Sequence, residues 1–200
     1  MPSKYCLEVS ETIFDNPQPL IFILNDIQIF KTSQIITPQR KIAPFQVSTG
    51  MEIEDLYDYG NKADYYGLDI SYGMLKKCRR NSKKWNIDIG LVQGNAETLP
   101  FKDEVFDMVF HIGGINFFNN KAKAIEEMIR VAKPGANIYI GDETAKQIEK
   151  QPKIISYFYQ KPDPQIYDPP VKHIPEEMIN VMTHTLWDEI IYLVAFQKPE

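Results

Sequence analysis

The sequence has few cysteines and no long apolar run. Its two cysteines, Cys6 and Cys78, form no CxxC motif, so neither a disulfide framework nor a zinc site is predicted. The apolar run Leu20–Leu24 has five residues, whereas a membrane-spanning helix needs about twenty. Acidic and polar residues follow Met1–Lys4, where a signal peptide would be apolar. We therefore expect a cytoplasmic protein with no membrane partner.

An excess of basic charge is also missing. The 200 residues include 22 Lys or Arg and 27 Asp or Glu, which gives a net charge of −5. A duplex-binding surface needs a basic field, so we expect no nucleic-acid partner. The three histidines, His111, His173 and His184, lack the spacing of metal ligands, so no metal is expected. The length and the 44% apolar content predict a single domain over residues 1–200.

Short apolar runs alternate with helical stretches from about Asp64 onward. The expected strands are Tyr65–Ile70, Ile87–Val92, Phe106–Ile112 and Ala136–Ile140. The expected helices are Ser71–Trp85, capped by Ser71, and Asn120–Ala132, which a turn at Lys133-Pro134-Gly135 ends. This alternation predicts an α/β fold with a mainly parallel sheet.

The first of these helices is amphipathic and basic. Met74, Leu75 and Cys78 form its apolar stripe, and six Lys or Arg residues lie between Lys76 and Lys84. The cations have two interpretations, a solvated face or a nucleic-acid contact, and the acidic chain favours the solvated face.

The two ends of the chain differ from the middle. Residues 1–44 are atypical; two strands, Leu20–Leu24 and Ile27–Lys31, are expected there, and they could pair with another copy in a homodimer. After residues 45–143, which form the expected core, residues 144–200 are predicted to supply a polar helix, a covering segment and a closing hairpin. The covering segment is Gln151–Pro175, and the hairpin is formed by Ile179–His184 and Ile190–Gln197 around a turn at Trp187–Glu189.

A ligand site is indicated where the predicted strands end. Small residues, Ser48, Thr49 and Gly50, follow a short strand, Phe45–Val47, and Asp69 closes the next strand. In nucleotide-binding α/β folds such a turn lets backbone approach the ligand, and the carboxylate accepts both ribose hydroxyls. Asp69 could instead cap the following helix. The polar loop Gly94–Phe101, with its apolar edge, could hold a purine at the same edge of the sheet.

Four motifs in register resemble the class I S-adenosylmethionine-dependent methyltransferases, especially quinone-biosynthesis C-methyltransferases and other small-molecule enzymes. They are Tyr66-Gly67-Leu68-Asp69-Ile70-Ser71, Gly94–Phe101, Phe106-Asp107-Met108-Val109-Phe110 and Arg130–Gly135. The resemblance covers about half the chain, from Val47 to Glu143. It implies a Rossmann-like seven-stranded sheet, mainly parallel, with a C-terminal antiparallel hairpin and helices on both faces.

The resemblance also assigns roles to residues. It implies S-adenosylmethionine as cofactor, with Asp69 on the ribose, Asn95 and Ala96 at the adenine, and the turn Ser48–Gly50 around the methionine part. The full cofactor set it implies is Ser48, Thr49, Gly50, Asp69, Ile70, Asn95, Ala96, Glu97 and His111. The acceptor pocket it implies is formed by Gly113, Gly114, Asn116 and Phe117, with Phe118 as a further wall.

His111 is the candidate general base, because its pKa lies near neutrality and it ends the strand beside this pocket. The alternative is a strand-end histidine with a structural hydrogen bond. The predicted function is methyl transfer to a small-molecule acceptor.

Two other functions stay open. Gln46, Ser48 and Glu52 depart from the family's acidic and glycine positions, which favours a non-catalytic relative that acts through partner binding. Asp69 would also suit an NAD-linked oxidoreductase, although the chain lacks the GxGxxG turn.

Overall fold

The computed structural model describes residues 41–45, 64–86, 88–146, 164–186 and 188–200. Several predicted features lie outside these ranges. They are the strands Leu20–Leu24 and Ile27–Lys31, Gln46 and Val47 of the expected first strand, the turn Ser48–Gly50, Glu52, Trp187 of the hairpin turn, and much of Gln151–Pro175.

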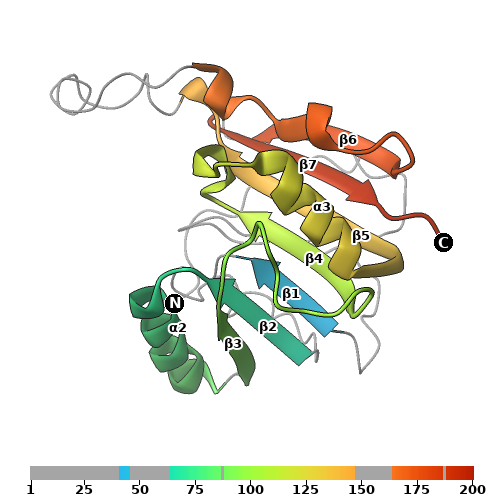
Figure 1. Ribbon diagram of the computed structural model, residues 1–200. Coiled ribbons are helices and arrows are strands. Elements are labelled where there is room, and N and C mark those ends of the chain that lie inside the picture. Colours follow the sequence, from blue (N-terminus) through green and yellow to red (C-terminus); the bar gives the residue numbers. More distant parts are fainter. Residues whose placement is uncertain (1–40, 46–63, 87, 147–163, 187) are drawn as a thin grey trace, which may run out of the picture.

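Within the described ranges seven strands form one sheet in the order β3-β2-β1-β4-β5-β7-β6 (Figure 1). The strands are β1 Lys41–Phe45, β2 Asp64–Asp69, β3 Ile89–Gln93, β4 Phe106–Ile112, β5 Ala132–Glu143, β6 Ile179–Leu186 and β7 Ile191–Gln197. Along this order, β3, β2, β1, β4 and β5 pair in parallel with their neighbours, and β7 pairs antiparallel with both β5 and β6. The predicted parallel core and closing hairpin are confirmed.

Helix α2, Tyr72–Trp85, connects β2 to β3. The Ser71 hydroxyl accepts a hydrogen bond from the Met74 N–H at 3.4 Å, so Ser71 is the predicted N-cap. Leu75 and Cys78 are buried on the face toward the sheet. Asn86 ends the helix in a left-handed conformation with φ of 59°.

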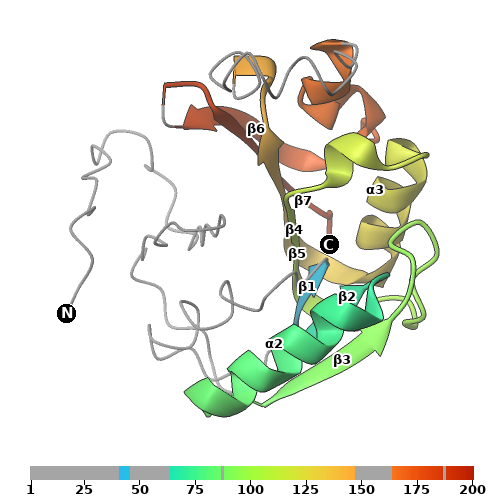
Figure 2. The same ribbon diagram turned by 90° about the vertical axis from the view of Figure 1, so that its left-hand side faces the viewer.

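Helix α3, Lys121–Val131, connects β4 to β5 and lies on the opposite face of the sheet from α2 (Figure 2). It begins after Asn120, whose side chain accepts from the Lys123 N–H at 3.0 Å. Ile125, Met128 and Val131 of α3 join Leu68, Ile138 and Tyr192 in the main apolar core, a cluster to which none of the described side chains of α2 belongs. The crossovers from β2 to β3 and from β4 to β5 run in opposite directions along the sheet. Because such crossovers are right-handed, their two helices lie on opposite faces.

The expected turn at Lys133-Pro134-Gly135 is wrong in its boundaries, because β5 begins at Ala132, directly after α3. In the β4–β5 pairing the register shifts, because Phe106 pairs with Ala132 and Met108 pairs with Asn137. The residues Lys133-Pro134-Gly135 therefore form an irregular stretch at the start of β5. Gly135, with φ of 73°, supplies the left-handed conformation there. Pro134, which has no N–H to donate, fits where regular pairing is interrupted.

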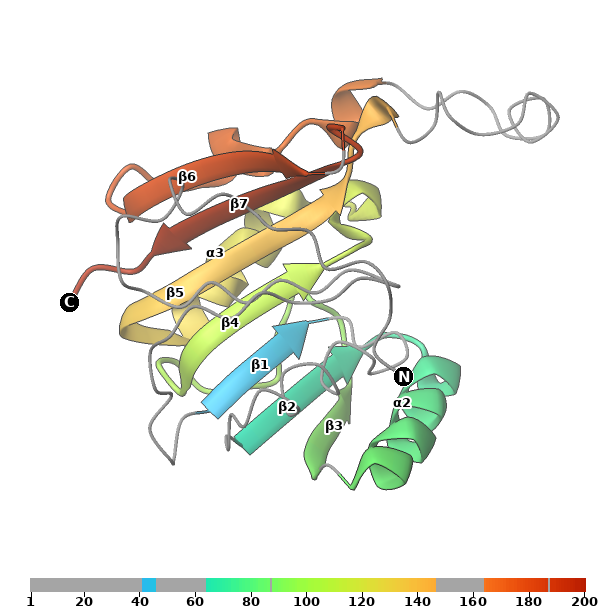
Figure 3. The ribbon, with the colours of Figure 1, turned by 180° about the vertical axis from the view of Figure 1, so that it is seen from behind.

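Strands β1 and β4 are neighbours, but their connections leave in opposite directions, to β2 and to β5 (Figure 3). In open α/β sheets ligands bind in the crevice that such a reversal opens at the carboxyl ends of the strands. The loops after β2, β3 and β4 all lie at this edge.

Candidate functional site

A cavity of about 320 Å³ lies at the carboxyl ends of β2, β3 and β4. Its lining residues are Leu68, Asp69, Ile70, Gly94, Asn95, Ala96, Glu97, Gly114, Phe117, Phe118 and Asn119. Small-molecule sites begin at roughly 300 Å³ and are mostly apolar with a few placed polar groups. The volume and the lining suit a group of nucleoside size.

Asp69 is the last residue of β2 and is only 5% exposed. Its Oδ1 atom accepts a hydrogen bond from the Ser71 N–H at 2.7 Å. Burial raises the pKa of the Asp69 carboxyl, and the Ser71 bond opposes that rise only in part. A buried carboxylate that gains hydroxyl donors from a ligand would recover the solvation it lost on folding.

The loop after β3 is held in shape by its own hydrogen bonds. Asn95 accepts from the Glu97 N–H at 2.9 Å through its side chain and from the Thr98 N–H at 3.1 Å through its carbonyl. A Cβ on Gly94 would lie 2.9 Å from Leu68 Cδ1, so a larger residue would displace the buried Leu68 side chain, and glycine permits the close approach of this loop to β2. The loop therefore presents Asn95 and Ala96 to the cavity in a fixed conformation.

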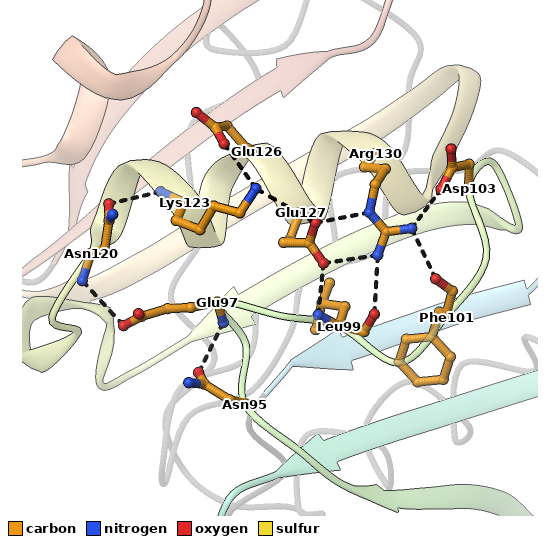
Figure 4. Close-up of polar contacts among 10 residues, drawn as sticks. All are labelled: Asn95, Glu97, Leu99, Phe101, Asp103, Asn120, Lys123, Glu126, Glu127 and Arg130. Carbon is orange, nitrogen blue, oxygen red and sulfur yellow. Dashed lines mark hydrogen bonds and ion pairs between the residues drawn. The ribbon is translucent and has the colours of Figure 1, made fainter.

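Two residues of α3, Glu127 and Arg130, anchor this loop from behind (Figure 4). Glu127 Oε2 accepts from the Leu99 N–H at 2.7 Å, and Arg130 donates to the carbonyls of Leu99 at 3.0 Å and Phe101 at 2.9 Å. The pKa of Glu127 is lowered mainly by its hydrogen bond with Arg130, whereas burial acts in the opposite direction and raises it.

Glu97 makes a further bond to the same helix, because its Oε1 atom accepts from the Asn120 N–H at 3.1 Å. The loop is thus tied to both ends of α3.

The facing wall follows β4. Gly113 and Gly114 adopt positive φ values of 79° and 93°, and they lead into a short 3-10 helix, Ile115–Phe117. Phe117 is 69% exposed, and Ile70 on the other wall is 72% exposed. Two uncovered apolar side chains therefore flank the cavity, an arrangement that suits a flat apolar ring.

His111 and Gly113 do not line this cavity. The His111 side chain is buried, and its ring lies 5.0 Å from that of Phe118 between centroids. Phe118 thus lies between the histidine and the cavity edge that the structure describes.

Asn116 does not line the cavity either, because its polar groups are used inside the protein. Its backbone N–H donates to Asp142 Oδ2 at 2.8 Å, and its side-chain nitrogen donates to the Glu143 carbonyl at 2.7 Å. The Tyr192 hydroxyl donates to Asn116 Oδ1 at 2.9 Å. Burial raises the pKa of Asp142, and backbone donors that include Asn116 oppose this rise. The network fixes the loop after β4 to β5 and β7.

We expect Tyr192→Phe to destabilise the protein by about 1–2 kcal/mol, because it leaves the buried Asn116 oxygen without this donor. The urea midpoint of unfolding measures the loss. Tyr167→Phe is the matched control, since Tyr167 is a buried tyrosine outside the Asn116 network. An unchanged midpoint for Tyr192→Phe would contradict a structural role for the bond.

Sequence reasoning missed the lining residue Asn119 and the anchoring pair Glu127 and Arg130. The pair had one signal, an acid and a base three positions apart on a predicted helix, but that spacing is common on solvated helices. Ser48, Thr49 and Gly50 lie outside the described residues.

In the described ranges no group of three or more His, Cys, Asp or Glu residues could hold a metal ion. No helix in these ranges is long and apolar enough to cross a membrane.

A sheet in this order, with a buried acid at the end of β2 beside a cavity, defines a methyltransferase-like α/β fold. Residues 45–140 match the family model of the methyltransferase domain. A solved S-adenosylmethionine-dependent methyltransferase from Aquifex aeolicus has a similar fold. Its TM-score is 0.60 at 18% identity, over 79% of this chain and 81% of that one.

Curated relatives give a more specific similarity. The demethylmenaquinone methyltransferase of Renibacterium salmoninarum is 31% identical over 140 residues, which are 65% of this chain and 56% of that protein. The ubiquinone/menaquinone biosynthesis C-methyltransferase of Wigglesworthia glossinidia brevipalpis is 32% identical over 143 residues, 65% of this chain and 57% of that protein. The chain spans about half the length of these relatives.

Proposed function

We propose that this protein binds S-adenosylmethionine in the cavity after β2 and β3 and transfers its methyl group to a small apolar acceptor. The observation that carries the proposal is Asp69, a buried carboxylate that ends β2 and lines the cavity opposite the fixed loop Gly94–Glu97. The family match supports the cofactor class.

In this proposal the residues present fit a nucleoside. Asp69 accepts the ribose hydroxyls, Asn95 bonds the edge of the base, and Ile70 and Ala96 contact its faces. The turn Ser48–Gly50 is proposed for the methionine part. The cofactor, when bound, supplies an electrophilic methyl group on a sulfonium.

The acceptor is proposed from the relatives and from the wall after β4. The two relatives are named for quinone biosynthesis, and Phe117, exposed and edge-on to Tyr167 at 6.2 Å, offers an apolar contact for such a ring. Methyl transfer gains most from alignment and from exclusion of water, which apolar walls provide. Gly113 and Gly114 let the backbone approach the acceptor. His111 is proposed as the base for an acceptor that must lose a proton.

The alternative is a non-catalytic relative, which the departures at Gln46, Ser48 and Glu52 favour. Binding of S-adenosylhomocysteine, the product of methyl transfer, separates the two proposals. The catalytic proposal expects saturable binding by titration calorimetry and methyl transfer to a demethylated quinone analogue. No binding at millimolar ligand would favour the non-catalytic relative.

The pH dependence of that binding is also expected to report Asp69. Ligand hydroxyls favour the ionised carboxylate, so the pKa of Asp69 in the complex lies below its raised value in the free protein. Affinity is therefore constant above the free-state pKa and falls as pH decreases through it, by up to about tenfold per pH unit. Asp69→Asn is the control and loses this dependence; an identical profile in Asp69→Asn would contradict the assignment.

A further inference from the structure

The outer face of α2 carries a group of cations that the proposed reaction does not use. We call it the basic face of α2, and it consists of Lys76, Lys77, Arg79, Arg80, Lys83 and Lys84, all exposed. These residues follow one another along a helix of 14 residues that contains no acidic residue, about 20 Å in length. The positive charge is concentrated here although the whole chain has a net charge of −5.

The basic face differs from several other cations in the part of the chain that the structure describes. Leu75, Cys78 and Ser82 are buried on the sheet side of α2, so helical periodicity turns the cations outward. Other basic residues, such as Lys123, Arg130 and Lys133, pair with carboxylates. Within the part of the chain that the structure describes, no carboxylate lies within ion-pair distance of the basic face.

Apolar side chains continue this face toward the cavity. Tyr72, at the start of α2, is 63% exposed, and the Lys76 ammonium lies 5.9 Å from the centre of its ring. Ile70 lies two residues earlier, is exposed, and lines the cavity. Figure 3 shows α2 beside β3 at one edge of the sheet, far from the hairpin of β6 and β7. One continuous surface thus joins the basic face to one wall of the cavity.

We propose that the basic face of α2, with Tyr72 and Ile70, docks this protein on an anionic lipid bilayer. Lysine and arginine near such a surface each add to binding, and exposed aromatic side chains settle at the membrane–water interface. The two exposed apolar residues favour a bilayer over a nucleic acid, whose backbone offers them no apolar phase. A peripheral contact needs no membrane-spanning helix, so it revises only the expectation that the protein has no membrane partner.

The docking would bring the cavity mouth to the lipid phase, where an apolar acceptor is dissolved. This purpose rests on the proposed function, but the docking itself does not. Lipid binding and cofactor binding are measured separately, so failure of one leaves the other standing.

The test is sedimentation of the full chain with vesicles of phosphatidylcholine containing about one third phosphatidylglycerol. We expect binding that is absent with phosphatidylcholine alone and that weakens as salt is raised. Lys76→Gln/Lys83→Gln should bind about 25-fold more weakly, since each charge near the surface contributes about fivefold. Lys77→Gln/Lys84→Gln is a second variant with the same expectation.

Lys102→Gln/Lys172→Gln is the matched control, because it removes the same charge at exposed sites outside α2, and it should bind vesicles within about twofold of the native chain. Thermal unfolding establishes that each variant is folded. Equal losses in the control and in the α2 variants would mean that net charge alone matters and would overturn the proposal. No binding to anionic vesicles at low salt, or tighter binding to single-stranded or duplex DNA than to vesicles, would overturn it as well.

Discussion

Replacing Asp69 with alanine is expected to weaken the binding of S-adenosylhomocysteine by about 10- to 100-fold. The contacts of ligand hydroxyls with a charged, buried acceptor contribute about 1.5–3 kcal/mol in all, and Asp69 ends β2 inside the cavity. Alanine keeps the strand but removes both carboxylate oxygens. Titration calorimetry measures the change.

Two further variants make this result specific. Asp69→Asn keeps one oxygen that can accept from the Ser71 N–H, so the turn after β2 is preserved while the charge is lost. Its affinity should fall between those of the native protein and Asp69→Ala. Asp64→Asn changes an exposed aspartate at the other end of β2 and should leave affinity unchanged. If Asp69→Ala lowers stability but not affinity, Asp69 serves only the turn.

Arg130→Met is expected to destabilise the fold by about 1–3 kcal/mol, the cost of leaving a mostly buried acceptor without its donor in a half-buried ion pair. The substitution leaves Glu127 without its partner at 2.8 Å and removes donors to the carbonyls of Leu99 and Phe101. The side chain of Glu127 is only 10% exposed, so water replaces the lost bonds poorly. The urea midpoint of unfolding and its slope give the change.

The matched control uses the exposed ion pair of the same helix. Lys123→Met breaks the contacts of an exposed lysine with Glu126 at 3.2 Å and with Glu127 at 4.0 Å, which should cost less than about 1 kcal/mol. The pKa of Glu127 is lowered in the folded protein, so its stabilising effect is complete above the ordinary pKa of glutamate and is lost as pH falls through the lowered value. Arg130→Met should therefore cost less stability in acid. Equal costs for the two variants would contradict the anchoring role of Arg130.

The elements that the sequence predicted well have strong local signals. Strand β4 has the predicted bounds, Phe106–Ile112, because most residues of this short run are apolar and most of them are buried. Helix α2 begins after Ser71 as predicted, since a cap and an apolar stripe coincide there. The positions of Asp69 and of the loop from Gly94 to Glu97 at one cavity were also foreseen, because the carboxyl ends of parallel strands meet at one edge.

The rest depended on contacts between distant residues. Nothing local shows that Asn116 bonds to Asp142 and Tyr192, which are 26 and 76 positions away, so it was assigned to the acceptor pocket. Pro134 and Gly135 have the composition of a turn, but the Gly135 N–H donates to the carbonyls of Lys198 and Pro199, and these contacts with the C-terminal residues hold them at the start of β5. In both places tertiary hydrogen bonding overrides the local preference.

The attachment of the cavity loop to both ends of α3 links ligand binding to the motions of that helix. The Glu97 bond to Asn120 and the Leu99 bond to Glu127 must break before the loop can open. A ligand held by Asn95 and Ala96 lowers the population of such open states, and with it the rate at which the amide hydrogens of α3 exchange with solvent. Hydrogen exchange in α3 would therefore report whether the cavity is occupied, even where the average structure stays the same.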